Sequence, residues 1–225
     1  MPKLSEETQA LRRNRILDAA ERCFVRSGFN GATMQDIRRE AGVSAGGLYV
    51  YFRSKEDLIE GISQRDRAQV RDNVALVAAG DDIVEGLASV LRGSAIERPL
   101  DKVRLFIEMG AQANRSPAVA RVLRECDGDI RSALEETLAH AAARDQIRPT
   151  MPISELAQFM MMVVDGLFWR RCVDPHFDAA AMGPHILRMF GVAMGVEQLP
   201  SSPTPPERPH APPAAQTHIH SEVAR

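Results

Sequence analysis

The sequence predicts an all-α protein with a small amino-terminal helical domain and a larger helical body. Apolar residues recur at spacings of three and four through most of the chain, and no segment alternates apolar and polar residues as a half-buried strand would. Capping residues and glycines mark the ends of the expected helices. Aromatic residues make up only 5% of the chain and Met numbers ten, a composition that suits packing between helices.

The first expected helix covers residues 7–27, and Gly28 is expected to end it as a C-terminal cap. Residues 33–52, TMQDIRREAGVSAGGLYVYF, then predict two short helices around a tight turn. Thr33 and Asp36 have the spacing of a capping box, Gly42 can take the positive φ of the turn, and Ser44 can cap the second helix. This order is typical of the helix-turn-helix that enters the DNA major groove, although plain helical packing produces the same shape.

The body is expected to be helical throughout, with helices at residues 55–79, 81–96, 101–114, 116–145, 154–172 and 178–196. The helix at 55–79 begins beside the helix-turn-helix and ends in the body, so it is expected to link the two mechanically. From residue 197 the chain is rich in Pro, which predicts a disordered tail. We therefore expect a DNA-binding domain at 1–56, a helical body at 57–196 and a tail at 197–225.

The net charge of −2 conceals an asymmetry, because residues 1–55 carry +4 and the remainder carries −6. A basic end on an acidic body favours a polyanionic partner for that end, although a solvated charged face has the same composition. Cys23, Cys126 and Cys172 are far apart and no Cys/His spacing fits a metal site, so we expect reduced thiols, no metal and a cytoplasmic protein. The longest apolar run, near residues 159–164, is too short to cross a bilayer.

Three stretches resemble the DNA-binding domain of TetR-family transcriptional regulators: RILDAAERCFVRSGFNGATM at 15–34, DIRREAGVSAGGLYVYF at 36–52 and SKEDL at 54–58. The resemblance is confined to the first quarter to third of the chain. It implies a homodimeric repressor that binds double-stranded operator DNA and responds to a small-molecule effector. No cofactor is implied.

The resemblance carries phosphate or base contact onto Thr33, Ser44, Tyr49, Tyr51 and Lys55. Further candidates follow from their positions in the motif, and these are Arg38, Ala45, Gly46 and Gly47. Ala45 can touch a thymine methyl group, and two glycines allow close approach of the backbone to DNA. No Arg, Gln or Asn stands at the start of the second short helix to make a bidentate base contact.

Dimerisation and effector binding are assigned to the body. The expected dimer interface is an apolar stripe on the helix at 154–172, formed by Leu156, Phe159, Val163 and Leu167, although the same stripe can fill the core of one subunit. Regulators of this family enclose a pocket, and the candidate lining residues here are Phe106, Glu108, Met109, Gln112, Met160, Asp165, Phe168 and Trp169. Met and aromatic side chains favour an apolar or aromatic effector.

Two other classes of function remain open at this stage. One is a DNA-binding architectural or division factor without a ligand, which a fully packed body would favour. The other is a helical enzyme, against which the sequence lacks GxSxG, HExxH and a Gly-rich phosphate loop. A regulator without catalytic residues is the leading hypothesis.

Overall fold

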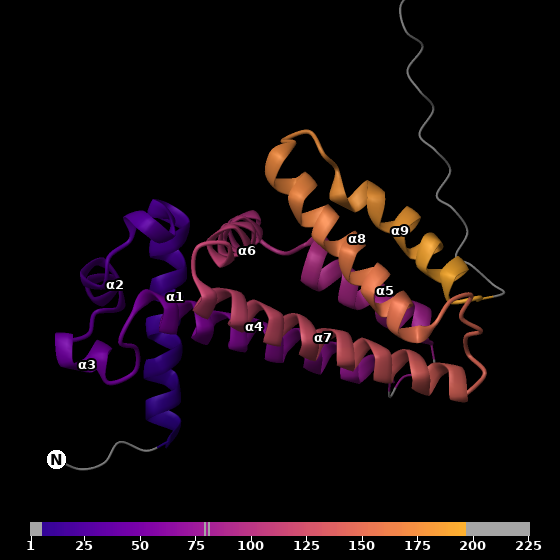
Figure 1. Cartoon of the computed structure of the whole chain (residues 1–225), viewed down its shortest axis with the longest axis horizontal. Coiled ribbons are helices and arrows are strands. Elements are labelled where there is room, and N and C mark those ends of the chain that lie inside the picture. Colours follow the sequence, from indigo (N-terminus) through magenta and orange to yellow (C-terminus); the bar gives the residue numbers. More distant parts are fainter. Residues whose placement is uncertain (1–5, 79, 81, 197–225) are drawn as a thin grey trace, which may run out of the picture.

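The computed structural model describes residues 6–78, 80 and 82–196 (Figure 1). The helices are α1 (Glu6–Gly31), α2 (Met34–Ala41), α3 (Ala45–Tyr49), α4 (Lys55–Ala78), α5 (Ile83–Leu91), α6 (Leu100–Ala113), α7 (Pro117–Ala143), α8 (Ile153–Val173) and α9 (Ala179–Ala193), with a π-helical turn η1 (Arg92–Ile96) after α5. The described part of the chain contains no strand, which confirms the all-α prediction. The expected tail at 197–225 lies outside the described residues.

Two helices differ from their expected form. Gly28 interrupts α1 with φ 69° and ψ 165°, but the helix resumes and ends at Gly31, so Asn30-Gly31 is helical where a turn was expected. The single helix expected at 81–96 is divided into α5 and η1. The positive φ of Gly28 breaks α1 without ending it, because a short helical segment follows immediately.

The amino-terminal core is larger than the expected domain. It is built from buried residues of α1 to α3, and it continues into the first two turns of α4 through Leu58, Ile59 and Ile62. Leu105 and Met109 of α6 and Val119 of α7 also belong to this core. The amino-terminal domain therefore shares its core with the body, because α6 packs directly on α1.

The body surrounds a second core. Helix α4 lies along α7 on one side of this core, and α8 and α9 lie on the opposite side of it, as Figure 1 shows. Helix α6 lies between α1 and α8 and touches both. None of the helices in the described part of the chain has the length and apolar character needed to cross a membrane.

Candidate DNA-binding surface and internal cavity

Short-range hydrogen bonds hold the turn between α2 and α3. Thr33 Oγ1 accepts from the Asp36 N–H at 3.1 Å, and the Asp36 carboxylate accepts from the Thr33 N–H at 3.2 Å. Gly42 follows with φ 62°, and a Cβ there would lie 2.7 Å from Nη2 of Arg15. Ser44 caps α3 by accepting from the N–H three residues on, at 3.1 Å. The predicted capping box, glycine turn and second cap are confirmed.

The capping box also has an electrostatic signature. Hydrogen bonds from the side chain and backbone of Thr33 lower the pKa of Asp36, so the carboxylate that caps α2 is ionised at neutral pH. The Thr33 hydroxyl in turn donates to Asp36 Oδ2 at 2.5 Å. The hydroxyl proton of Thr33 is therefore already used, and contact between Thr33 and a phosphate stays a prediction.

Helix α3 has only five residues, and small residues form the start of its outer face. Leu48 is fully buried and anchors the helix, while Ala45 and Gly46 are exposed at its leading end. Tyr49 is 51% exposed and Val50 is 79% exposed, so both project from the end of the helix. Val50 was not predicted from the sequence, although its place directly after Tyr49 is a usable signal.

Arg38, Tyr51 and Lys55 lie closer to the protein than an outward DNA contact suggests. Arg38 is partly buried, and Tyr51 packs against the amino-terminal core. Lys55 Nζ donates to the backbone oxygen of Phe29 at 2.6 Å and lies 4.6 Å from the centre of the Phe29 ring. The ammonium group thus binds the backbone at the break in α1, and its contact with phosphate stays a prediction.

Two arginines of α1 add positive charge beside α3. Arg12 and Arg15 line a hollow with Gly42, Ser44 and Gly47 on the same side of the domain. Guanidinium groups are strong phosphate ligands. The sequence analysis did not name Arg12 and Arg15, although the cluster of Arg at positions 12, 13 and 15 was an available signal.

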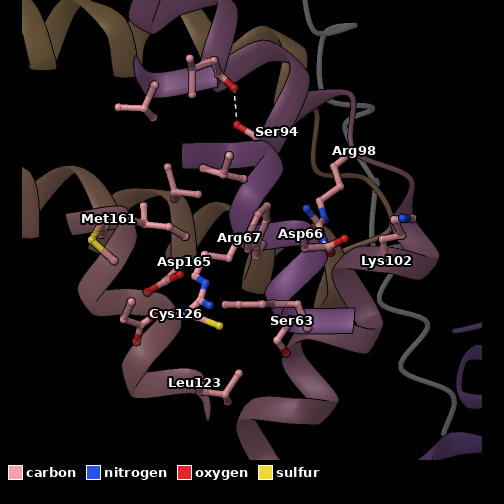
Figure 2. Close-up of a pocket in the computed structure, with 18 of the residues that line it drawn as sticks. Ser63, Asp66, Arg67, Ser94, Arg98, Lys102, Leu123, Cys126, Met161 and Asp165 are labelled. Atoms are coloured by element: carbon pink, nitrogen blue, oxygen red, sulfur yellow. Dashed lines mark hydrogen bonds and ion pairs between the residues drawn. The ribbon is translucent and has the colours of Figure 1, made fainter. Parts of the chain in front are cut away.

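The body contains a partly open cavity of about 180 Å³ lined by residues of α4 to α9 and by one residue of α1 (Figure 2). Phe106, Met109, Met160, Asp165 and Phe168 line it as predicted. The rings of Phe106 and Phe168 meet edge to face, with 5.3 Å between their centroids. These five residues bring α6 and α8 together around an apolar space.

Three predicted lining residues do not reach the cavity. Glu108 accepts a hydrogen bond from the Phe29 N–H of α1, and Gln112 lies at the end of α6 outside the lining. Trp169 is 55% exposed on the outer side of α8. The reason is helical geometry, because one residue rotates a side chain by about 100° and two residues turn it to the opposite face.

Sequence reasoning also missed the polar groups of the cavity. Arg98 forms an ion pair with Asp66, Lys102 lies 3.3 Å from a carboxylate oxygen of Glu21, and Arg67 lies 3.1 Å from Asp129 outside the cavity. The hydroxyl of Ser63 and Nε of Arg98 are buried without a hydrogen-bond partner. Figure 2 shows Ser63, Asp66 and Arg67 projecting from α4 toward the cavity. Their spacing along α4 with Val70 and Val74 was the available signal.

Asp127 on α7 and Asp165 on α8 also line the cavity. Burial and, to a smaller extent, the negative charge of Asp127 together raise the pKa of Asp165 from 3.8 to about 6. Burial likewise raises the pKa of Asp127, and Arg131 partly offsets that effect. Packed protein on one side of each carboxyl disfavours its ionised form, yet both residues are exposed to solvent.

The four residues of the predicted dimer stripe are buried or partly buried within the subunit. Leu156 and Leu167 are buried within the subunit, and Phe159 packs edge to face on Phe190 with 6.0 Å between ring centroids. Val163 is partly buried against the same core. The stripe thus fills the core of the subunit, as the alternative interpretation proposed. Large exposed apolar residues lie instead at Met162, Trp169 and Val173 of α8 and at Met182, Met189 and Val192 of α9.

A helix-turn-helix domain joined to a helical body with an internal cavity defines a DNA-binding regulator with a place for a small molecule. Residues 16–62 match the description "Bacterial regulatory proteins, tetR family", and residues 84–190 match "BetI-type transcriptional repressor, C-terminal". The chain belongs to the TetR family of bacterial transcriptional regulators. The resemblance recognised in the amino-terminal motifs is therefore confirmed and extends through most of the body.

Individual relatives agree with this assignment. An HTH-type transcriptional repressor of Mycobacterium tuberculosis is 29% identical over 171 residues, which cover 76% of this chain and 87% of the relative. The HTH-type transcriptional repressor AcnR of Corynebacterium efficiens is 28% identical over 160 residues, covering 70% and 80%. The solved SmeT–triclosan complex has a similar fold, with a TM-score of 0.74, 24% identity and coverage of 88% of this chain and 98% of SmeT.

Proposed function

We propose that this chain is a dimeric repressor that binds operator DNA through α2 and α3 and releases it when a small apolar or aromatic molecule enters the cavity. The observation that carries this proposal is that the cavity and the DNA-binding domain share residues. Leu105 and Met109 line the cavity and also belong to the amino-terminal core. A molecule that displaces α6 would therefore move side chains on which the DNA-binding domain packs.

Relatives support the same reading. Those of Mycobacterium tuberculosis and Corynebacterium efficiens are named repressors, and the SmeT structure of similar fold is a complex with triclosan. A cavity of about 180 Å³ is large enough for one aromatic ring, because engineered cavities of about 150 Å³ bind benzene. The cavity favours a ligand-responsive regulator over a DNA-binding factor without a ligand.

The proposed dimer uses the exposed apolar face of α8 and α9, defined as Met162, Trp169, Val173, Met182, Met189 and Val192. Two helices from each subunit would form a four-helix interface about a two-fold axis. A two-fold dimer places two copies of α3 in successive turns of the major groove, as an operator with two half-sites requires. The protein would act in the cytoplasm, where such an operator is accessible.

The test is DNA binding to the region upstream of the protein's own gene, followed by release with added compounds. Fluorescence anisotropy at low salt should detect a specific complex, and unrelated DNA of the same length is the control. Failure to prefer the upstream region would contradict the operator assignment. A complex that no cavity ligand weakens would contradict the release mechanism while leaving DNA binding intact.

Contacts to DNA have a separate test. Arg12→Gln should weaken binding to all sequences alike and reduce the salt slope by roughly 1, because a phosphate contact is lost. Tyr49→Phe should weaken binding if the exposed hydroxyl meets a phosphate. Arg121→Gln on α7, whose side chain is exposed and 4.0 Å from Glu125, is the matched control. Equal affinity for all three variants would remove these contacts from the interface.

A further inference from the structure

More carboxylates than cations line the cavity. Each of its cations already faces a carboxylate, because Arg98 pairs with Asp66, Lys102 with Glu21, and Arg67 with Asp129. No ion pair or hydrogen bond engages Asp127 or Asp165 within residues 6–78, 80 and 82–196. The cavity wall therefore carries two carboxylates that have no cation of their own.

The positions of these carboxylates bring them together. Asp127 lies on α7 and Asp165 on α8, two helices that pack against each other, and both residues line the same cavity. The nearest attraction for Asp127 comes from Arg131, one turn along α7, whose Nε lies 3.7 Å from Glu135. Two like charges at the edge of an apolar space attract a positively charged group from outside the chain.

A second observation points to a ligand at the same place. The Ser63 side chain is only 6% exposed, lines the cavity, and has an Oγ with no hydrogen-bond partner in the described structure. Figure 2 shows Ser63, Cys126 and Asp165 around the same space. A buried hydroxyl without a partner costs free energy, and a donor on a bound molecule would remove that cost.

The rest of the wall suits the apolar body of such a molecule. Phe106 and Phe168 meet edge to face, and Met160 and Met161 add polarisable sulfur. Aromatic faces also attract cations, and Met adapts to flat ligands. At about 180 Å³ the cavity holds one ring and a short side chain, and not a large polycyclic compound.

Building on the repressor function proposed above, we propose that the effector is a small lipophilic cation, an aromatic or compact aliphatic body carrying a protonated amine. Its ammonium group binds at Asp127 and Asp165, with Ser63 as a further acceptor, and its apolar body packs against Phe106 and Phe168. An anionic effector has no free cation to meet in this wall, since Arg98, Lys102 and Arg67 are already paired.

The experiment compares three probes of nearly equal shape: phenethylammonium, phenethyl alcohol and phenylpropanoate. Isothermal titration calorimetry on the full chain at neutral pH measures each affinity. The ammonium probe should bind roughly tenfold or more tightly than the alcohol, because charge-assisted contacts are about twice as strong as neutral ones. The carboxylate probe should bind most weakly of the three.

Variants separate the two carboxylates from general packing. The double variant Asp127→Asn, Asp165→Asn should abolish the preference for the ammonium probe while leaving affinity for the alcohol unchanged. Glu125→Gln is the matched control, because Glu125 is an exposed carboxylate of α7 outside the cavity lining. It should keep the full preference. Binding of the alcohol by the double variant shows that its cavity is still formed.

Several outcomes would overturn the proposal. These are equal binding of all three probes, preference for the carboxylate, no binding of the ammonium probe at millimolar concentration, or a preference that survives in the double variant. The proposed repressor function is judged separately by DNA binding. A chain that binds its operator and is released by a neutral or anionic compound keeps its function but loses this effector class.

Discussion

The carboxylate of Glu108 on α6 accepts a hydrogen bond from the backbone N–H of Phe29, at the break in α1. Lys55, the first residue of α4, donates to the backbone oxygen of the same residue at 2.6 Å. Phe29 is therefore held by α4, which leads from the DNA-binding domain into the body, and by α6, a helix of the body that packs on α1. Helix α6 also lines the cavity, so it offers a second route between the cavity and the DNA-binding domain beside α4.

Glu108→Ala should uncouple ligand binding from DNA release. The change leaves the buried Phe29 N–H without an acceptor, which should lower the free energy of unfolding by about 1–3 kcal/mol. More ligand should then be needed to release DNA, although affinity for the ligand itself is kept. Urea denaturation and DNA release measure the two effects. Glu108→Gln retains an acceptor and is the control; equal release curves for both variants would exclude this route.

Glycines 42 and 46 should respond in opposite ways to alanine. Gly42→Ala forces a Cβ into a left-handed residue and against Arg15, so it should destabilise the domain by roughly 1 kcal/mol or more. Gly46→Ala meets no atom within 4 Å and should stabilise α3 by up to about 1 kcal/mol. Urea denaturation gives both values. If Gly46→Ala folds more stably but loses DNA binding, Gly46 is needed for close approach of the DNA.

The exposed apolar face of α8 and α9 should be required for dimerisation. Trp169→Glu or Met189→Glu places a charge on side chains that are 55% and 56% exposed, so the subunit should stay folded but become monomeric. Light scattering after size exclusion measures the mass. Leu11→Glu, at a residue 66% exposed on α1, is the control and should remain dimeric. Dimers in all three variants would place the interface on another face.

Asp165 should make stability fall as pH rises. Its pKa is raised from 3.8 to about 6 in the folded chain, so between these values the native state holds a proton that the unfolded state has lost. The free energy of unfolding therefore decreases through this window and stays lower above it. The charged groups that share the cavity wall with Asp165 include Asp127 on α7 and Arg67 on α4, whose guanidinium is paired with Asp129.

Asp165→Asn tests this pH dependence because it removes the titrating group. The melting temperature should rise relative to the unmodified chain at pH above about 6 and change little at pH below about 4. An identical difference at both ends of the range would contradict the raised pKa. Asp101→Asn, on the exposed start of α6, is a control that should show no such pattern.

The helix-turn-helix was predictable because its contacts are local. Thr33 and Asp36 are three residues apart, Gly42 carries its turn in its own backbone, and Ser44 bonds three residues ahead. The same reasoning placed the ends of most helices within a few residues. It failed at Gly28, where the glycine predicted the end of α1. The helix does break there, but a further helical segment continues to Gly31.

The cavity was predictable only in part. The family resemblance and the residue types indicated Phe106 and Phe168 as pocket residues, and the structure brings their rings together across 62 positions of sequence. They did not separate Phe168 from Trp169, since both are large and apolar and only the packing of α8 decides which one turns inward. Arg98 and Asp127 gave no sign of their role, because polar residues normally face solvent, and Ser63 offered only its spacing along α4 with Val70 and Val74.

By itself, the sequence determined the all-α class, the helix-turn-helix and its caps, because these depend on helical periodicity and on bonds between residues a few positions apart. Tertiary structure alone decided the partner of Glu108, the surface left exposed on α8 and α9, and the two unpaired carboxylates of the cavity. Each of these depends on how distant helices rotate and pack against one another, and no spacing within a single helix records that rotation.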